Sequence, residues 1–158
     1  MYFPYTMKGD CMEQTLVILK PNAVQRELIG ELISKFERRG LKISAMKMET
    51  VSRETAEIHY REHKEKHFYD DLIGFITSGP SVIMILEANG GVEIVRRMVG
   101  STNPAEAEPG SIRGDYAISP GHNLIYASDS LEAAKREIEL FFEPSEIMDY
   151  RLSVRPWL

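Results

Sequence analysis

Residues 14–45 read QTLVILKPNAVQRELIGELISKFERRGLKISA, and this stretch decides the fold. Residues 14–19, with the apolar run LVIL at 16–19, predict a buried strand that ends at Lys20. Over residues 23–39 the apolar side chains recur at helical spacing, which predicts an amphipathic helix. Gly40 follows at the position where a glycine commonly ends a helix, so a second strand is expected to begin directly after it.

That second strand is followed by two predicted helices. Apolar and polar residues alternate from residue 41, and the slip in the alternation at Met46 predicts a bulge or burial on both faces of the strand. Ser52 is a suitable N-cap for a helix that runs to about residue 63. A further helix is expected before Gly79. It gathers four apolar side chains on one face, namely Phe68, Leu72, Ile73 and Ile76.

The second half of the chain repeats the order of strand and helix. Residues 82–86 are continuously apolar and predict a central strand, and a turn at residues 89–91 leads into a short helix. Residues 101–122 show little periodicity. A loop of that length inside one domain is usually functional. Residues 123–127 are predicted to form the last strand.

A final helix completes the pattern. It is expected over residues 130–142, with Asp129 and Glu132 at the spacing of a capping box. The order βαββαβ predicts a ferredoxin-like α+β fold, in which helices pack on a four-stranded antiparallel sheet. We expect an N-terminal extension at residues 1–13 and a single domain at residues 14–158. By itself this fold implies no function.

Composition limits the classes of function. The chain has 158 residues, is 43% hydrophobic and carries a net charge of −5, which suits one domain with an apolar core. It shows no run long enough for a membrane span or a signal peptide. Cys11 is the only cysteine, so a cytoplasmic location without an internal disulfide is expected. The negative charge argues against stable nucleic-acid binding but leaves room for a local phosphate pocket.

Candidate phosphate-binding residues lie mostly at the ends of predicted elements or in the long loop. They are Lys20, Arg96, Thr102 and Arg113. Lysine and arginine suit phosphate oxygens because they offer charge-assisted hydrogen bonds. The sequence holds no Gly-rich Walker loop, dinucleotide-binding fingerprint or zinc-type cysteine cluster. For any one of these residues alone, a solvated surface charge is the commoner explanation.

Four local strings, taken in order and at their spacing, change that assessment. They are LVILKPNAVQRELIGELISKFERRG, HYREHKEKHFYDDLIGFITSGP, TNPAEAEPGSIRGDY and NLIYASDS. Over about residues 14–150 the chain resembles the nucleoside diphosphate kinases. The resemblance implies transfer of a γ-phosphoryl group between nucleotides such as ATP and ADP, by a ping-pong route through a phosphorylated strand histidine. It also implies Mg²⁺ bridging the nucleotide phosphates, without protein metal ligands, and a homo-oligomer, typically a hexamer.

The same resemblance implies a role for each matching residue. Lys20 would contact the transferred phosphoryl group and the ribose hydroxyls, and Tyr60 would lie beside the catalytic side chain. Phe68 would stack on the base, although a lone phenylalanine is more often a core residue. The remaining roles are phosphate binding by Arg96, Thr102 and Arg113, sugar binding by Asn123, and support of the catalytic position by Ser128 and Glu137.

The chain departs from the family pattern at the catalytic position, where Tyr126 stands in place of the histidine. Neutral imidazole is a good nucleophile near pH 7, whereas a phenol has an ordinary pKa of about 10 and is almost fully protonated there. The phenol oxygen also projects farther from the backbone, so it should either crowd the γ-phosphate or turn aside. Three departures are minor: Asn22-Ala23 for Asp-Gly, His122 for arginine, and Ala127 for glycine.

No other histidine is an obvious replacement for the missing nucleophile. His122 lies four residues before Tyr126, roughly 13 Å away along an extended strand. His59, His63 and His67 recur every fourth residue and would form a metal-binding stripe on a continuous helix, but a helix break is predicted within them. A solvated or capping role is therefore expected for these three.

Tyr126 leaves three interpretations. The favoured one is a kinase scaffold with an intact nucleotide site and a single replaced nucleophile, natural or engineered, which binds nucleotide but transfers phosphate poorly. It is favoured because the surrounding site residues are retained. The second is a non-catalytic nucleotide-binding or interaction protein. The third is an enzyme that uses Tyr126 itself as a slow nucleophile.

Overall fold

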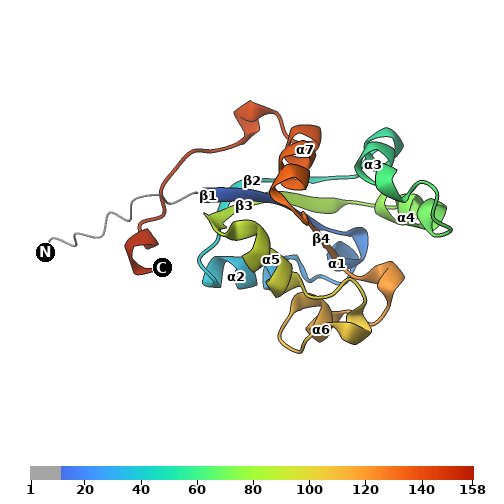
Figure 1. Ribbon diagram of the computed structural model, residues 1–158, viewed down its shortest axis with the longest axis horizontal. Coiled ribbons are helices and arrows are strands. Elements are labelled where there is room, and N and C mark those ends of the chain that lie inside the picture. Colours follow the sequence, from blue (N-terminus) through green and yellow to red (C-terminus); the bar gives the residue numbers. More distant parts are fainter. Residues whose placement is uncertain (1–11) are drawn as a thin grey trace, which may run out of the picture.

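The computed structural model of the protein describes residues 12–158. Its centre is a four-stranded antiparallel sheet with strand order β2-β3-β1-β4 (Figure 1). This confirms the predicted ferredoxin-like α+β fold. The strands are β1 (Met12–Leu19), β2 (Lys42–Glu49), β3 (Ser81–Asn89) and β4 (Ile125–Ala127).

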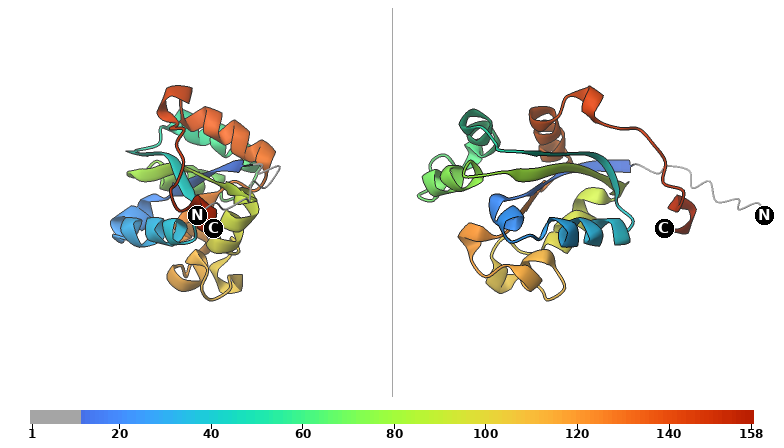
Figure 2. Two further views of the ribbon diagram at one scale, coloured as in Figure 1. Left: turned by 90° about the vertical axis from the view of Figure 1, so that its left-hand side faces the viewer. Right: turned by 180° about the vertical axis from the view of Figure 1, so that it is seen from behind.

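Helices cover both faces of the sheet (Figures 1 and 2). One face carries α2 (Ile29–Arg38) and α5 (Gly91–Val99), and the other carries α3 (Arg53–His59), α4 (Tyr69–Ile76) and α7 (Leu131–Phe141). A hydrophobic core lies on each face of the sheet, and alternate residues of β1 point into one or the other. Val17 and Leu19 pack with α2 and α5, while Leu16 and Ile18 pack with α3, α4 and α7. No helix within residues 12–158 is long and apolar enough to cross a bilayer.

Short helices fill the connections. They are α1 (Pro21–Gln25), α6 (Ile112–Tyr116) and the 3₁₀ turns Arg61–His63, Pro104–Glu106, Pro120–His122, Pro144–Glu146 and Arg155–Trp157. The long loop predicted at residues 101–122 is therefore partly helical. It contains a buried cation, Arg113 on α6, which is 3% exposed.

Two predicted helix boundaries and one predicted cap were wrong. The single helix expected over residues 23–39 is two helices, α1 and α2, because the backbone turns at Glu27 with φ 56°. The helix expected to reach residue 63 ends at His59. The capping box is absent from α7, which is capped by Ser130, whose Oγ accepts from the backbone N–H of Ala133 at 3.1 Å. Apolar periodicity carries no information on such local hydrogen bonds.

The strands differ from the prediction mainly at their ends. β1 begins at Met12, and residues 1–11 of the proposed extension lie outside the described part of the chain. The irregularity in β2 falls between Ile43 and Ala45 rather than at Met46. It turns Ser44 toward β3, where its Oγ donates to Glu87 Oε2 at 3.1 Å. The last strand begins at Ile125 and not at residue 123.

Candidate functional site

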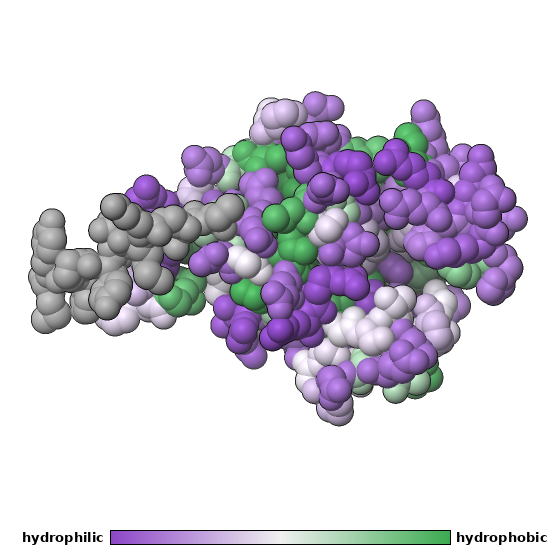
Figure 3. Space-filling view, viewed as in Figure 1, coloured by the Kyte–Doolittle hydropathy of each residue, from purple (hydrophilic) through white to green (hydrophobic). Residues whose placement is uncertain are grey.

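A cleft of about 1610 Å³ opens beside the end of β4, between the α3–α4 region and the 102–123 segment. The surface over α3 and α4, on the right in Figure 3, is largely hydrophilic. The cleft gathers all but one of the residues that the sequence singled out; the exception, Ser128, lies behind Glu137. The residues that line it are Lys20, Tyr60, Phe68, Arg96, Thr102, Arg113, Asn123, Tyr126 and Glu137.

Lys20 provides a buried amine at the end of β1. It is 6% exposed, and its Nζ donates to Asn123 Oδ1 at 2.8 Å. The Asn123 side chain is itself fixed, because its Nδ2 donates to the Thr102 carbonyl at 3.1 Å. Burial, and then the nearby positive charge of Arg113, lower the pKa of Lys20 to about 7. Near neutral pH this amine therefore changes its charge.

Arg113 is held by three main-chain carbonyls from two segments of the chain. Its guanidinium donates to the carbonyls of Asn123 at 3.3 Å, Gly100 at 2.9 Å and Ile125 at 2.6 Å. A guanidinium has five N–H groups, so two remain for a ligand in the cleft. Ser111 packs so closely against the backbone at position 100 that a glycine is required there. Gly100 has φ 88°, and a Cβ at this position would lie 2.4 Å from Ser111 Oγ. The hydrogen bonds of the Arg113 guanidinium therefore tie the loop at residues 101–122 to the backbone at each of its ends.

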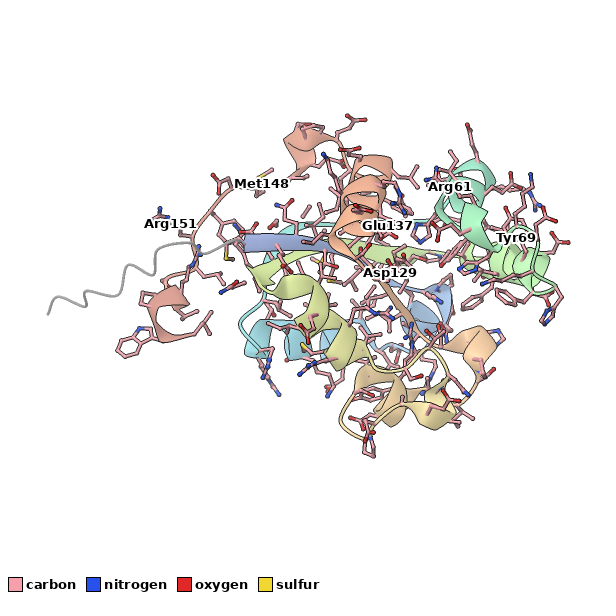
Figure 4. All side chains as sticks on the ribbon, in the orientation of Figure 1. Arg61, Tyr69, Asp129, Glu137, Met148 and Arg151 are labelled. Atoms are coloured by element: carbon pink, nitrogen blue, oxygen red, sulfur yellow. The ribbon has the colours of Figure 1, made fainter. Side chains whose placement is uncertain are left out.

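The hydroxyl of Tyr126 is turned aside, which is one of the two outcomes expected from its length. It donates to Glu137 Oε1, and Ser128 Oγ donates to Glu137 Oε2 at 2.6 Å. The backbone N–H of Leu16 in turn donates to Ser128 Oγ at 3.1 Å. Figure 4 shows Glu137 midway along α7, with Asp129 nearby in the segment that joins β4 to this helix. The network ties the phenol to α7 instead of presenting its oxygen freely to the cleft.

Electrostatics keeps this phenol protonated. Burial raises the pKa of Tyr126 first, the negative charge of Glu137 raises it further, and so does the hydrogen bond to that carboxylate. Burial also raises the pKa of Glu137, while the hydrogen bonds from Ser128 and Tyr126 oppose that rise. A protonated phenol that already donates its hydrogen to a carboxylate is a poor nucleophile.

His59 corrects the expectation of a solvated or capping role. Its ring lies 4.5 Å, centroid to centroid, from the rings of both Tyr60 and Tyr126. Both of its ring nitrogens and the Tyr60 hydroxyl are buried without a hydrogen-bond partner. Burial lowers the pKa of His59 to about 3, so the imidazole is neutral at pH 7. The chain bends after α3, and only the tertiary structure brings His59 against Tyr126.

The histidine stripe does not form, because His59 ends α3 and His63 lies in a separate 3₁₀ turn. Within residues 12–158 no group of three or more histidine, cysteine, aspartate or glutamate side chains could hold a metal ion. Phe68 precedes α4 and is 39% exposed at the cleft, which distinguishes it from the buried residues Ile73 and Ile76. It is thus available to stack on a planar ligand.

Comparison with known proteins gives a consistent result. The nucleoside diphosphate kinase family model matches residues 13–147. Nucleoside diphosphate kinases of Listeria monocytogenes serotype 4a (strain HCC23) and Archaeoglobus fulgidus are 54% and 51% identical to the chain over 147 residues. These matches cover 93% of this chain in both cases, and 100% and 97% of the relatives.

A solved structure agrees with the sequence relatives. The halophilic nucleoside diphosphate kinase of Halobacterium salinarum in complex with CDP superposes with a TM-score of 0.90 at 43% identity. The alignment covers 92% of this chain and 97% of that one. Similarity of this extent, in both sequence and fold, goes well beyond a shared architecture. The chain belongs to the nucleoside diphosphate kinase family, a family of nucleotide-binding phosphotransferases.

Proposed function

We propose that this protein is a nucleoside diphosphate kinase scaffold that binds nucleotides normally but transfers the γ-phosphoryl group from a nucleoside triphosphate to a nucleoside diphosphate very poorly. The observation that carries the proposal is the Tyr126 hydroxyl bound to Glu137 within an otherwise complete cleft. The parent reaction is a ping-pong transfer through a phosphorylated residue at position 126. We also propose a cytoplasmic location, because Cys11 is the only cysteine in the sequence.

The cleft residues support a specific arrangement of the nucleotide. The base would stack on Phe68, and the sugar would contact Asn123 and Lys20. The phosphates would lie against Arg96, Thr102 and Arg113, and Lys20 would reach them as well as the sugar. Buried cations suit phosphate because charge-assisted hydrogen bonds are stronger where water is excluded. Stacking on an aromatic ring is permissive, since every base has a π-face.

The donor set of the cleft fits Mg²⁺ held by nucleotide phosphates rather than by the protein. Its proposed phosphate-binding residues are three cations and Thr102, and within residues 12–158 no group of three or more histidine, cysteine, aspartate or glutamate side chains could hold a metal ion. Bound Mg²⁺ would neutralise part of the phosphate charge. Lys20, Arg96 and Arg113 would orient the remaining phosphate oxygens.

The orphaned polar atoms around Tyr126 favour a replaced nucleophile. His59 and the Tyr60 hydroxyl have no hydrogen-bond partner, and a buried unpartnered polar group costs about 1–3 kcal/mol. A shorter side chain at position 126 would leave room for water to reach these atoms. The site is thus better suited to an imidazole than to a phenol.

One observation favours the alternative, a pseudoenzyme in which binding alone is the function. The hydrogen bonds among Tyr126, Glu137 and Ser128 are complete, so tyrosine is well accommodated. Both proposals predict that incubation with Mg-ATP leaves the intact mass of the protein unchanged. A stable phosphoprotein would instead support Tyr126 as a slow nucleophile.

We expect the protein to bind ADP with Mg²⁺, and more weakly as the pH rises from 7 to 8.5. The pKa of Lys20 is about 7 in the free protein, so above that pH the amine must take up a proton to face a phosphate. Calorimetry in buffers of different ionisation enthalpy should detect this proton uptake. The absence of a heat signal with millimolar ADP would refute the proposal of an intact nucleotide site.

The Lys20→Met variant is the control for the pH dependence. It should bind ADP more weakly but without a change between pH 7 and 8.5, since the titrating amine is gone. If the variant keeps the pH dependence of the unmodified protein, another group is responsible for it.

We also propose a homo-oligomer, with a hexamer as the size typical of the family. Trp157 and Leu158 in the tail are 77% and 69% exposed, and Ile118 in the long loop is 94% exposed. Apolar side chains at such positions suit burial against a second copy. Light scattering at micromolar concentration should show a mass several times the 18.0 kDa of one chain. A particle of 18 kDa alone would be incompatible with the proposal.

A further inference from the structure

His122 joins the two walls of the cleft at its rim. Its ring lies edge-on to Phe75 of α4, with centroids 4.8 Å apart and planes at 81°. Its carbonyl accepts a hydrogen bond from Asn22 Nδ2 at 2.9 Å. Both aromatic residues line the cleft, with His122 exposed and Phe75 half-buried.

The contact connects the base side of the cleft to its phosphate side. Phe75 lies on α4, and Phe68, on which the base is proposed to stack, is the N-cap of the same helix. His122 adjoins Asn123, which binds Lys20 through its side chain and Arg113 through its carbonyl. A shift of α4 away from the 119–123 segment would therefore separate the group that stacks on the base from the groups that hold sugar and phosphate.

We propose that His122 is a positioning residue whose edge-to-face contact with Phe75 holds the two walls of the cleft together and slows nucleotide release. We call this contact the clasp. The inference rests on the proposed nucleotide binding. Edge-to-face aromatic pairs are stabilising beyond their buried area, enough for about a two- to tenfold change in rate when breaking the pair is part of opening. In this proposal His122 acts through its aromatic ring and not through a positive charge, because it is the ring that contacts Phe75.

Stopped-flow release of a fluorescent N-methylanthraniloyl-ADP tests this clasp. The variants His122→Ala and His122→Lys should release the nucleotide about two- to tenfold faster, whereas His122→Phe should stay within about twofold of the unmodified protein. Phe75→Leu should accelerate release as His122→Ala does, and the double variant should be no faster than either single one. Ser119→Ala, in the same segment, is the matched control and should leave release unchanged.

The outcomes separate the clasp from the proposed function. If the unmodified protein fails to bind the fluorescent nucleotide, the nucleotide site is refuted and the clasp with it. If it binds, but His122→Ala releases at the unmodified rate, only the clasp is refuted. Slow release by His122→Lys together with fast release by His122→Phe would assign the effect to charge and overturn the aromatic role. Additive effects of the two single changes would also overturn it.

Discussion

Replacing Tyr126 with histidine should raise the rate of phosphoryl transfer from ATP to a second nucleoside diphosphate by about a thousandfold or more. Ping-pong transfer requires a group that attacks the γ-phosphorus and later leaves easily. Neutral imidazole does both near pH 7. The phenol of Tyr126 does neither, because it is protonated, donates to Glu137 and would form a more stable phosphate ester. Positioning by Lys20 and Arg113 would be common to both proteins.

A coupled kinase assay on the two proteins measures this difference, and Tyr126→Phe is the matched control. Removing only the hydroxyl should leave the low rate unchanged, which would show that the phenol oxygen performs no chemistry. The Tyr126→His protein should form a phosphoenzyme that is labile in acid and stable in alkali. If the unmodified protein turns over as fast as Tyr126→His, position 126 is not the nucleophile and the proposed mechanism is wrong.

Glu137 gives a second readout of the same mechanism. In the Tyr126→His protein its carboxylate is in place to accept an N–H from the new imidazole, as it now accepts the Tyr126 hydroxyl. Such a bond would fix the tautomer and leave the other nitrogen free to attack. Adding Glu137→Gln to Tyr126→His should therefore lower transfer while leaving ADP affinity nearly unchanged.

The order of elements could be predicted from the sequence because each strand and helix has its own apolar period. Residues 16–19 and 82–86 are continuously apolar, which predicts buried strands, and they lie in the central pair β1 and β3. Boundaries were harder to predict. The break at Glu27 and the cap at Ser130 depend on single backbone angles and hydrogen bonds that hydrophobic spacing does not encode.

The candidate site could be predicted only where local strings resemble a family. Lys20 and Arg113 were candidates from their residue type and place at the ends of elements or in the long loop, but only the resemblance gave them and Phe68 specific roles, and all three line one cleft. His59 was misjudged because helical spacing placed it in a stripe, whereas its surroundings come from β4 and α7, far away in sequence. The pairing of His122 with Phe75 spans 47 residues, since 122 − 75 = 47, and no local pattern marks it.

Arg113→Met should weaken ADP binding by about 3 kcal/mol, or more than about a hundredfold, the second large effect that we expect. Part of the loss is a charge-assisted phosphate contact, which contributes about 1.5–3 kcal/mol. The rest arises because the buried carbonyls of Gly100 and Ile125 lose their donor, so the loop that carries the site relaxes. Arg113→Lys should not rescue binding, since one ammonium cannot reproduce the fork of a guanidinium.

Arg97→Met provides the matched control for this prediction. Arg97 lies on α5 beside Arg96, but its side chain is 80% exposed and pairs with Glu93 at 2.7 Å, outside the cleft. The same substitution there should leave ADP affinity unchanged by calorimetry, because an exposed ion pair contributes little. Thermal unfolding separates the two functions of Arg113. A lower Tm with unchanged affinity would show that Arg113 only closes the loop, and its two remaining N–H groups would then have no role in binding phosphate.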